Sequence, residues 1–281
     1  NFRQLGMKTA GHPENFLSDV VETTTGPLGQ GLANSVGFAI AEESLRAKFG
    51  PNIIDHYTYV MAGDGCLMEG VSQEAISLAG HLSLNKLIVF WDNNNITIDG
   101  PVDLTDSTNQ KIRFEASGWN VIEIDGHDPS AIDMAIKAAK ISQKPTMIAC
   151  KTHIALGTAA QDTSKGHGAL TDPELIKNAR EVYKWSHKPF DIPKSVKEQW
   201  EEAGLKGDKT FKEWKSNLEN LSVSKKSEFE RVFNGDIPKK MSTVIRKFKK
   251  ENSAASPTVA TRKASELTLN TINSIMGETI G

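Results

Sequence analysis

The chain has 281 residues, 38% of them hydrophobic and 24% charged, a composition typical of a globular protein with one large domain and an appended part. Its 33 Lys and Arg against 35 Asp and Glu give a formal net charge of −2, which argues against a general nucleic-acid-binding protein. No apolar run reaches the ~20 residues of a membrane-spanning helix, and the two cysteines indicate neither a disulfide framework nor a zinc site, so we expect a cytoplasmic protein without membrane association.

The expected secondary structure alternates between helices and strands over residues 30–150. In chain order we expect helix 30–48, strand 56–62, helix 70–82, strand 87–91, helix 108–117, strand 120–124, helix 129–142 and strand 145–150. The strands are short and mostly apolar, which is typical of parallel strands covered on both faces. Asp128-Pro129 supplies an N-cap followed by proline at the first helical position. This alternation predicts an α/β fold, a doubly wound parallel sheet flanked by helices.

The pattern changes from about residue 172 onward. TDPELIKNAREVYKW begins with a helix cap, and the stretches after it are amphipathic and rich in charge, so we expect a helical C-terminal extension. The small and polar segment ENSAASP, residues 251–257, is the best linker candidate. We therefore expect a domain over residues 1–250 that includes the helical extension, a linker at 251–257 and a separate segment at 258–281.

Polar motifs follow the first two expected strands. Gly63-Asp64-Gly65 comes after the first strand and Asn93-Asn94-Asn95 comes after the second. Ligands of parallel α/β sheets bind beyond the carboxyl ends of the strands, so neighbouring strands would bring these motifs together. Carboxylate, amide and carbonyl oxygens suit Mg²⁺ or Ca²⁺, and the glycines leave room for phosphate groups.

Each motif taken singly is more typical of an ordinary turn or loop, but the pairing of the two on strand ends favours a site for a metal ion and phosphate groups. Two familiar nucleotide-binding patterns are absent from the sequence, since it has neither a GxxxxGK[ST] loop nor a GxGxxG fingerprint.

The two motifs together, MAGDGCLMEG and WDNNNITIDG, closely resemble the thiamine diphosphate motif of transketolases. Further segments agree with this resemblance, namely KTAGHPE (8–14), VETTTGPLGQGLANSVGFAIAEE (21–43), RFEASGWNVIEIDGHD (113–128) and KGHGA (165–169). The resemblance points to transketolase or to its close relative dihydroxyacetone synthase. It implies the thiamine diphosphate-binding fold and an enzyme that transfers a two-carbon ketol unit from a ketose phosphate to an aldose phosphate in the pentose phosphate pathway.

The resemblance also implies roles for individual residues. The metal ligands would be the side chains of Asp64 and Asn94 and the carbonyl of Ile96. The expected cofactor-binding residues are Gly26, Pro27, Leu28, Asp64, Gly65, Asn94, Ile154 and His167. His12 and His167 match two catalytic histidines that line the substrate funnel and bind substrate, and imidazoles can move protons near neutral pH.

Further matches concern the substrate phosphate and the subunit interface. Arg262 matches an arginine that binds the sugar phosphate, for which a guanidinium group is well suited. Glu69 and Glu74 match glutamates near the interface of the family's homodimer. His127, in DGHD, has the place of a turn residue. His153 is a departure from the resemblance, because this position beside Ile154 is usually aliphatic.

Members of the resembled family are much longer than this chain. Residues 258–281 look like the start of their pyrimidine-binding domain, and the glutamate that activates the cofactor falls outside the chain. We therefore expect a fragment that is inactive alone and that belongs to a homodimer in the full-length enzyme. Two alternatives stay open: a half-subunit of a two-chain transketolase, and a non-catalytic scaffold module of the same fold.

Overall fold

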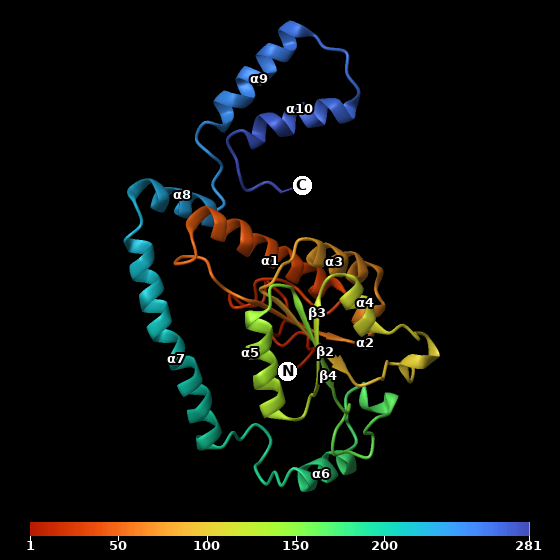
Figure 1. Cartoon of the computed structure of the whole chain (residues 1–281). Coiled ribbons are helices and arrows are strands. Elements are labelled where there is room, and N and C mark those ends of the chain that lie inside the picture. Colours follow the sequence, from red (N-terminus) through yellow and green to blue (C-terminus); the bar gives the residue numbers. More distant parts are fainter. Residues whose placement is uncertain (281) are drawn as a thin grey trace. The chain divides into compact units, whose positions relative to one another are not determined.

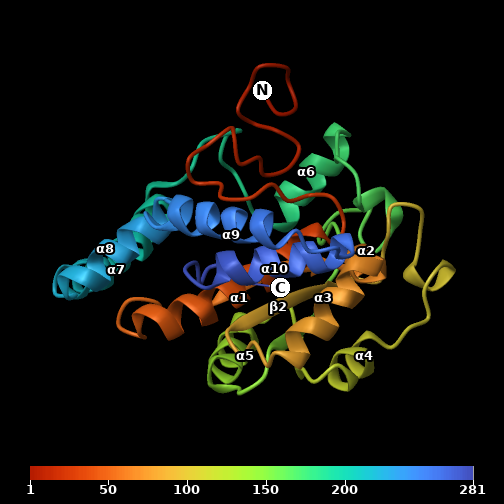
Figure 2. The ribbon, with the colours of Figure 1, turned by 90° about the horizontal axis from the view of Figure 1, so that it is seen from above.

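The computed structural model describes residues 1–280, which divide into two compact units, residues 1–201 and the residues from 202 onward. Residues 1–29 form a loop segment without helix or strand, drawn in dark red before α1 in Figure 2. The loop leads into the α/β part of the first unit, which carries the sequence motifs described above.

The first unit contains a sheet of four parallel strands. They are β1 (Thr58–Gly63), β2 (Leu87–Asn93), β3 (Asn120–Asp125) and β4 (Thr146–Lys151), and their order across the sheet is β1-β2-β4-β3. Gly63 pairs with Asp92, and Lys151 pairs with both Asn93 and Asp125, so the strands end at a common edge. The residues that follow these ends are therefore brought together in space.

Helices cover both faces of the sheet, as can be followed in Figure 1. On one face, α1 (Gln30–Phe49), α3 (Gly70–His81) and α4 (Gln110–Ala116) contribute to a core with Leu87, Val89 and Trp91 of β2. On the other face, α5 (Pro129–Ile141) packs against Ile88 of the same strand and Ile148 of β4. Successive residues of a strand point to opposite faces, so β2 supplies apolar side chains to both cores. The predicted doubly wound parallel sheet is confirmed.

Local hydrogen bonds explain where two of these helices begin. Asp128 caps α5 by accepting a hydrogen bond from the Ser130 N–H at 2.8 Å, directly before Pro129. Asn109 caps α4 in the same way, accepting from the Ile112 N–H at 3.1 Å. The cap predicted at Asp128 is therefore present.

The boundaries of the elements differ from the prediction in a few places. The strand expected from residue 56 starts at Thr58, and a short helix that the sequence did not predict, α2 (Asp64–Met68), follows β1 directly. Five residues make little more than one helical turn, so they are too few to show a helical period. Two 3₁₀ turns, η1 (Val102–Leu104) and η2 (Ser164–Gly166), lie in the loops after β2 and β4.

The helical C-terminal extension is also present. It consists of α6 (Pro173–Val182), α7 (Lys194–Glu219), α8 (Val223–Phe233), α9 (Met241–Ala255) and α10 (Thr261–Asn273). Helix α9 includes the first residues of the expected linker, and a non-helical segment runs over residues 256–260. The boundaries at residues 250 and 257 stay a prediction. None of the helices described for residues 1–280 has both the length and the apolar character that crossing a membrane requires.

Candidate functional site

A cavity of about 1020 Å³ lies where the carboxyl ends of the strands meet. The start of α2 after β1 and the loops after β2, β3 and β4 contribute to its wall. The predicted site residues among its lining residues are Leu28, Asp64, Gly65, Asn94, Ile96, Ile154 and His167. Residues separated by more than 130 positions in the sequence are thus brought into one cavity wall.

Asp64 is the buried carboxylate of this cavity, with only 7% of its surface exposed. Its oxygens accept hydrogen bonds from the Trp91 indole N–H at 3.0 Å and from the Asn95 backbone N–H at 2.9 Å. Burial nevertheless raises the pKa of Asp64 above its ordinary value, against the lowering effect of these hydrogen bonds. A divalent cation beside the carboxyl would offset the cost of burying its charge.

The loop after β2 presents Asn94 to the same cavity. The Asn94 side chain accepts from the Ile96 N–H at 3.0 Å and donates to Asp92 at 3.3 Å, while the Thr152 hydroxyl donates to the other oxygen of Asp92. Asn95 has a left-handed backbone conformation, with φ 63°, which turns the chain between Asn94 and Ile96. These bonds hold the amide at the end of β2, next to the strand from which Asp64 follows.

The donor chemistry fits a hard divalent cation. A carboxylate, an amide oxygen and a backbone carbonyl are oxygen ligands that Mg²⁺ and Ca²⁺ both accept. Among residues 1–280, no group of three or more His, Cys, Asp or Glu side chains is placed to hold a metal ion, so a site built from protein carboxylates and imidazoles alone is not present in this part of the chain. The proposed set depends on Asn94 and Ile96 as well as on Asp64.

The GPLG and GDG motifs touch each other. A methyl group at Gly65 would lie 3.3 Å from the Leu28 Cδ1 atom, so the Leu28 side chain rests over the glycine that we expect to face the diphosphate. Gly29, with φ 79°, precedes α1, and a side chain there would meet Glu69 and Ser72 of the neighbouring segment. The close approach explains why this loop needs a glycine at that position.

His12 and Gly26 are in direct contact, but they lie outside the lining of the large cavity. A methyl group at Gly26 would lie 2.5 Å from the His12 ring, and the His12 ring lies 3.2 Å from Glu14. His12 lines a separate, smaller pocket of about 370 Å³. Pro27 is exposed and does not line the large cavity either, so the roles of His12, Gly26 and Pro27 stay predictions.

His167 and Ile154 reach the cavity from the loops after β4. Gly166 lies close against this segment, since a methyl group there would be 2.7 Å from the Ala155 Cβ atom and 3.0 Å from the Ala160 carbonyl oxygen. The KGHG motif is therefore packed against the chain that follows Ile154, which keeps both residues at the same wall. Arg262 belongs to α10 in the second unit, is exposed, and its role stays a prediction.

Sequence reasoning missed several residues of this cavity, above all His153. Asp92, His127, Cys150 and His153 line it, although His127 was expected to serve only in a turn. The turn is present, because the His127 N–H donates to Asp125 at 2.8 Å. The signal that could have found the histidine pair is its spacing: each histidine stands two positions after the end of its strand, and the two strands are neighbours.

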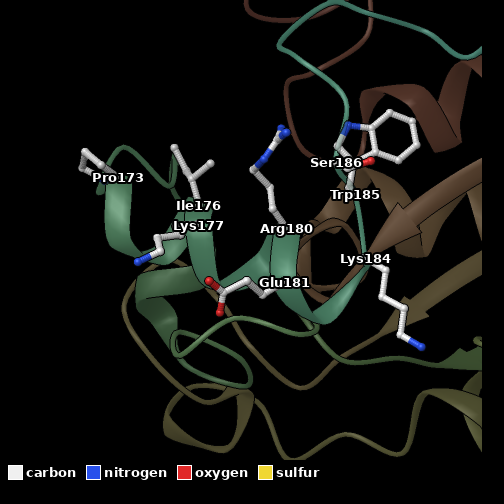
Figure 3. A pocket seen from close by; sticks show the side chains of 8 residues that line it. All are labelled: Pro173, Ile176, Lys177, Arg180, Glu181, Lys184, Trp185 and Ser186. Carbon is white, nitrogen blue, oxygen red and sulfur yellow. The ribbon is translucent and has the colours of Figure 1, made fainter.

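A second hollow lies along α6, and it shares no lining residue with the cavity. Its volume is about 680 Å³, and Figure 3 shows the side chains that line it, including Ile176, Arg180 and Trp185. Arg180 also donates to the backbone carbonyl of His187, which ties α6 to the following loop. None of the predicted site residues lines this groove. The cavity at the strand ends is therefore the better candidate for the functional site.

Comparisons with known proteins agree with the motifs. The sequence model of the family described as "Transketolase, thiamine diphosphate binding domain" matches residues 1–238. A transketolase of Rhodobacter capsulatus is 52% identical over 282 residues, which cover 100% of this chain and 42% of the relative.

Solved transketolase structures also resemble the fold. The transketolase from Leishmania mexicana gives a TM-score of 0.88 at 39% identity, over 98% of this chain and 42% of that chain. A transketolase from Pichia stipitis in complex with sedoheptulose-7-phosphate gives a TM-score of 0.89 at 38% identity, over 100% of this chain and 42% of that chain. The chain thus spans about two fifths of the length of the relatives that it matches.

Proposed function

The chain belongs to the transketolase family, by its thiamine diphosphate-binding domain, and on this premise we propose that its strand-end cavity holds the diphosphate of that cofactor. The observation that carries the proposal is the convergence of Asp64, Gly65, Asn94, Ile96 and His167 on one cavity. A buried carboxylate, oxygen donors beside it and a glycine without a side chain are what a metal-bound diphosphate needs.

The proposed metal ion is Mg²⁺ or Ca²⁺, held by Asp64, Asn94 and the carbonyl of Ile96. Thiamine diphosphate supplies the carbanion chemistry of the reaction when it is bound. The part of this chain is to fix the charged end of the cofactor. Leu28 and Ile154 offer apolar surface beside the polar groups, so we propose that they pack on the cofactor, with Gly26 and Pro27 in the same loop as Leu28.

We propose that the full-length protein transfers a two-carbon ketol unit between phosphorylated sugars. Related structures from Pichia stipitis contain fructose-6-phosphate, xylulose-5-phosphate or sedoheptulose-7-phosphate, which supports this substrate class. His167 would hold or move a proton of the substrate, His12 would assist it, and Arg262 would bind the sugar phosphate.

The chain spans 42% of the length of the Rhodobacter capsulatus relative, so the activity is proposed for a longer homodimeric protein in the cytoplasm. This chain contributes the diphosphate side of the site. We expect the chain to have no significant ketol transfer by itself. Full-length protein and isolated chain can be compared in one coupled ketol-transfer assay, and comparable turnover by the chain would contradict this expectation.

The metal assignment is tested with the variant Asp64→Asn, which removes the charge but keeps the size of the side chain. In the full-length protein, calorimetric titration with thiamine diphosphate and Mg²⁺ should show a loss of affinity of about 100-fold, since one charge-bearing metal ligand is lost. Asp133→Ala, which removes an exposed carboxylate of α5, is the matched control and should bind like the parent. An unchanged affinity in Asp64→Asn would remove the support for the metal site.

A further inference from the structure

Two histidine rings lie against each other in the wall of the cavity. The rings of His127 and His153 are stacked, with centroids 5.8 Å apart and an angle of 12° between their planes. A hydrogen bond also joins them, because the His153 backbone N–H donates to the His127 Nε2 atom at 3.0 Å. Both residues line the cavity that we assign to the cofactor. The pair is therefore a fixed part of this wall.

Asp162 determines where the proton of His153 sits. Both carboxylate oxygens of Asp162 lie 2.9 Å from the His153 Nδ1 atom, and this hydrogen bond lowers the pKa of Asp162 below its ordinary value. An ionised carboxylate can only accept hydrogen bonds, so Nδ1 of His153 carries the proton. The other ring nitrogen, Nε2, is then left for a ligand.

The stacked partner has the opposite arrangement. The Nε2 atom of His127 accepts a hydrogen bond from the His153 backbone N–H, so this nitrogen carries no proton while the bond is kept. His153 has no such restriction, because its Nδ1 already donates and its Nε2 can gain a proton. Of the two rings, His153 is the one that can become a cation in place.

A positively charged side chain at this position would balance part of the negative charge of the cavity lining. No Lys or Arg side chain lines it among the described residues, whereas the carboxylates Asp64 and Asp92 do. Because Nε2 of His127 is engaged as an acceptor, His153 and His167 are the lining side chains that can carry positive charge toward an anionic ligand. A diphosphate is strongly anionic, and a charge-assisted hydrogen bond to a phosphate oxygen is among the strong ones in proteins.

We propose that His153 is a further cofactor-binding residue, which donates a hydrogen bond from Nε2 to a phosphate oxygen of thiamine diphosphate, with Asp162 as its positioning residue. This inference rests on the proposed function of the cavity. Neutral His153 has no proton on Nε2, so binding of the anion draws one proton from solvent onto that nitrogen. Affinity should consequently increase as the pH falls through the neutral range.

Other titratable groups surround the pair and enter any pH profile. The ones that face it or share the cavity are Asp64, Asp92, Asp125, His127, Cys150, Lys151, Asp162 and His167. A change of pH dependence is therefore assigned to His153 only through variants that remove its ring or its partner.

The first measurement is calorimetric titration of the full-length protein with thiamine diphosphate and Mg²⁺. His153→Ile replaces the ring by an aliphatic side chain, and we expect it to bind about 10-fold more weakly at about pH 6.5, with a smaller difference at about pH 8.5. Repeating the titration in buffers of different ionisation enthalpy measures proton uptake, which should be smaller in the variant than in the parent.

Two further variants separate the chemistry from a general loss of structure. Asp162→Asn removes the charge, and asparagine suits the left-handed backbone at this position, φ 57°. This variant should lose less affinity for thiamine diphosphate than His153→Ile, with the same pH trend. His187→Ile is the matched control, since His187 also faces a carboxylate, Asp191 at 3.8 Å, but does not line the cavity. This control should bind like the parent at both pH values.

Each outcome decides between the two proposals. If the parent binds and His153→Ile matches it in affinity and proton uptake, the role of His153 is wrong while the function of the cavity stands. If the change His153→Ile weakens the binding of thiamine without phosphates as much as the binding of thiamine diphosphate, His153 contacts another part of the cofactor and the phosphate contact is wrong. If the parent itself fails to bind, the proposed function fails and this inference fails with it.

Discussion

The Asp106 side chain holds together the turn that leads into α4. Its carboxylate accepts hydrogen bonds from the Thr108 N–H at 2.8 Å and from the Gln110 amide at 3.0 Å. The hydrogen bonds from Thr108 are the main reason that the pKa of Asp106 lies below its ordinary value. Gln110 is buried, and its amide oxygen has no hydrogen-bond partner among the described residues. The hydrogen bond from its NH₂ group to Asp106 is therefore the one that this side chain depends on.

We predict that Asp106→Ala destabilises the protein by about 1–3 kcal/mol at neutral pH, because the buried Gln110 amide loses its acceptor. The pKa of Asp106 is lower in the folded state than its ordinary value of 3.8. Its ionised form therefore stabilises the fold at pH values above 3.8, and this stabilisation is lost as the pH falls through the folded-state pKa. The difference between parent and variant should therefore shrink as the pH falls below that value. Urea unfolding at several pH values measures it.

Asp103→Ala is the control for this experiment, since Asp103 is an exposed carboxylate in the preceding 3₁₀ turn. It should unfold like the parent at every pH. A difference between parent and Asp106→Ala that stays constant from neutral to acidic pH would contradict the role of the ionised carboxylate.

Single residues of the site could be predicted where a strand end fixed their place. Asp64 and Asn94 follow neighbouring parallel strands, and the geometry of such sheets brings them together. His12 and Arg262 could not be placed in this way. His12 lies in the long loop before α1, which has no periodicity, and Arg262 lies in a different compact unit. Backbone patterns say little about where such residues lie in space.

At the scale of elements, α3 and the end of α4 approach each other through a glycine. A methyl group at Gly80 of α3 would lie 1.7 Å from the carbonyl oxygen of Ser117, which follows α4. Trp119 packs at the same place, where its indole N–H donates to the Ile76 carbonyl at 2.9 Å. The atom that an added methyl group would meet belongs to the backbone, so α3 and the end of α4 would have to move apart to accommodate it.

We predict that Gly80→Ala destabilises the protein by about 2–4 kcal/mol, because the added methyl group overpacks this contact. Gly37→Ala is the matched control, since Gly37 lies inside α1 and a methyl group there meets nothing within 4 Å. It should stabilise the protein by about 0.5–1 kcal/mol through helix propensity alone. Urea unfolding followed by circular dichroism measures both, and destabilisation of equal size in the two variants would contradict the argument from close approach.

The elements themselves could largely be predicted from the sequence, because buried strands leave a clear signal. LIVFW and PTMIAC become the central strands β2 and β4, whose side chains are covered by helices on both faces. The short helix α2 gave no such signal. Helix α2 begins at Asp64, directly after β1. Such a direct change from strand to helix depends on packing in three dimensions, and local periodicity does not reveal it.

At the scale of the whole molecule, the two compact units divide inside a helix, while the linker expected at residues 251–257 stays a prediction. The division falls between Glu201 and Glu202, within α7. Composition could not predict it, because the segment is rich in helix-forming charged residues and contains no run of proline and small polar residues.

Helix α7 has few tertiary contacts along its first half, whereas near its C-terminal end the Trp214 ring lies 6.5 Å from the Phe229 ring of α8. None of its residues is buried, and it contains Gly204 and Gly207 in its interior. Its ion pairs, such as Lys206 with Glu202 at 3.7 Å, are exposed and of the kind that contributes little to stability. Each interior glycine costs about 1 kcal/mol relative to alanine. Local opening of α7 should therefore be easier than opening of the sheet.

We predict that trypsin, in limited digestion of the chain, cuts first within α7, near Lys206. The double variant Gly204→Ala/Gly207→Ala should slow this cut by about 30-fold, because two alanines stabilise the closed helix by about 2 kcal/mol when opening is fast relative to cleavage. Gly277→Ala, at a position outside α7 that also has open space around it, is the control and should leave the rate unchanged. Mass spectrometry of the first fragments locates the cut. A first cut in the loops of residues 1–201, or a rate in α7 that the alanines do not change, would show that the helix is not the weakest part of the chain.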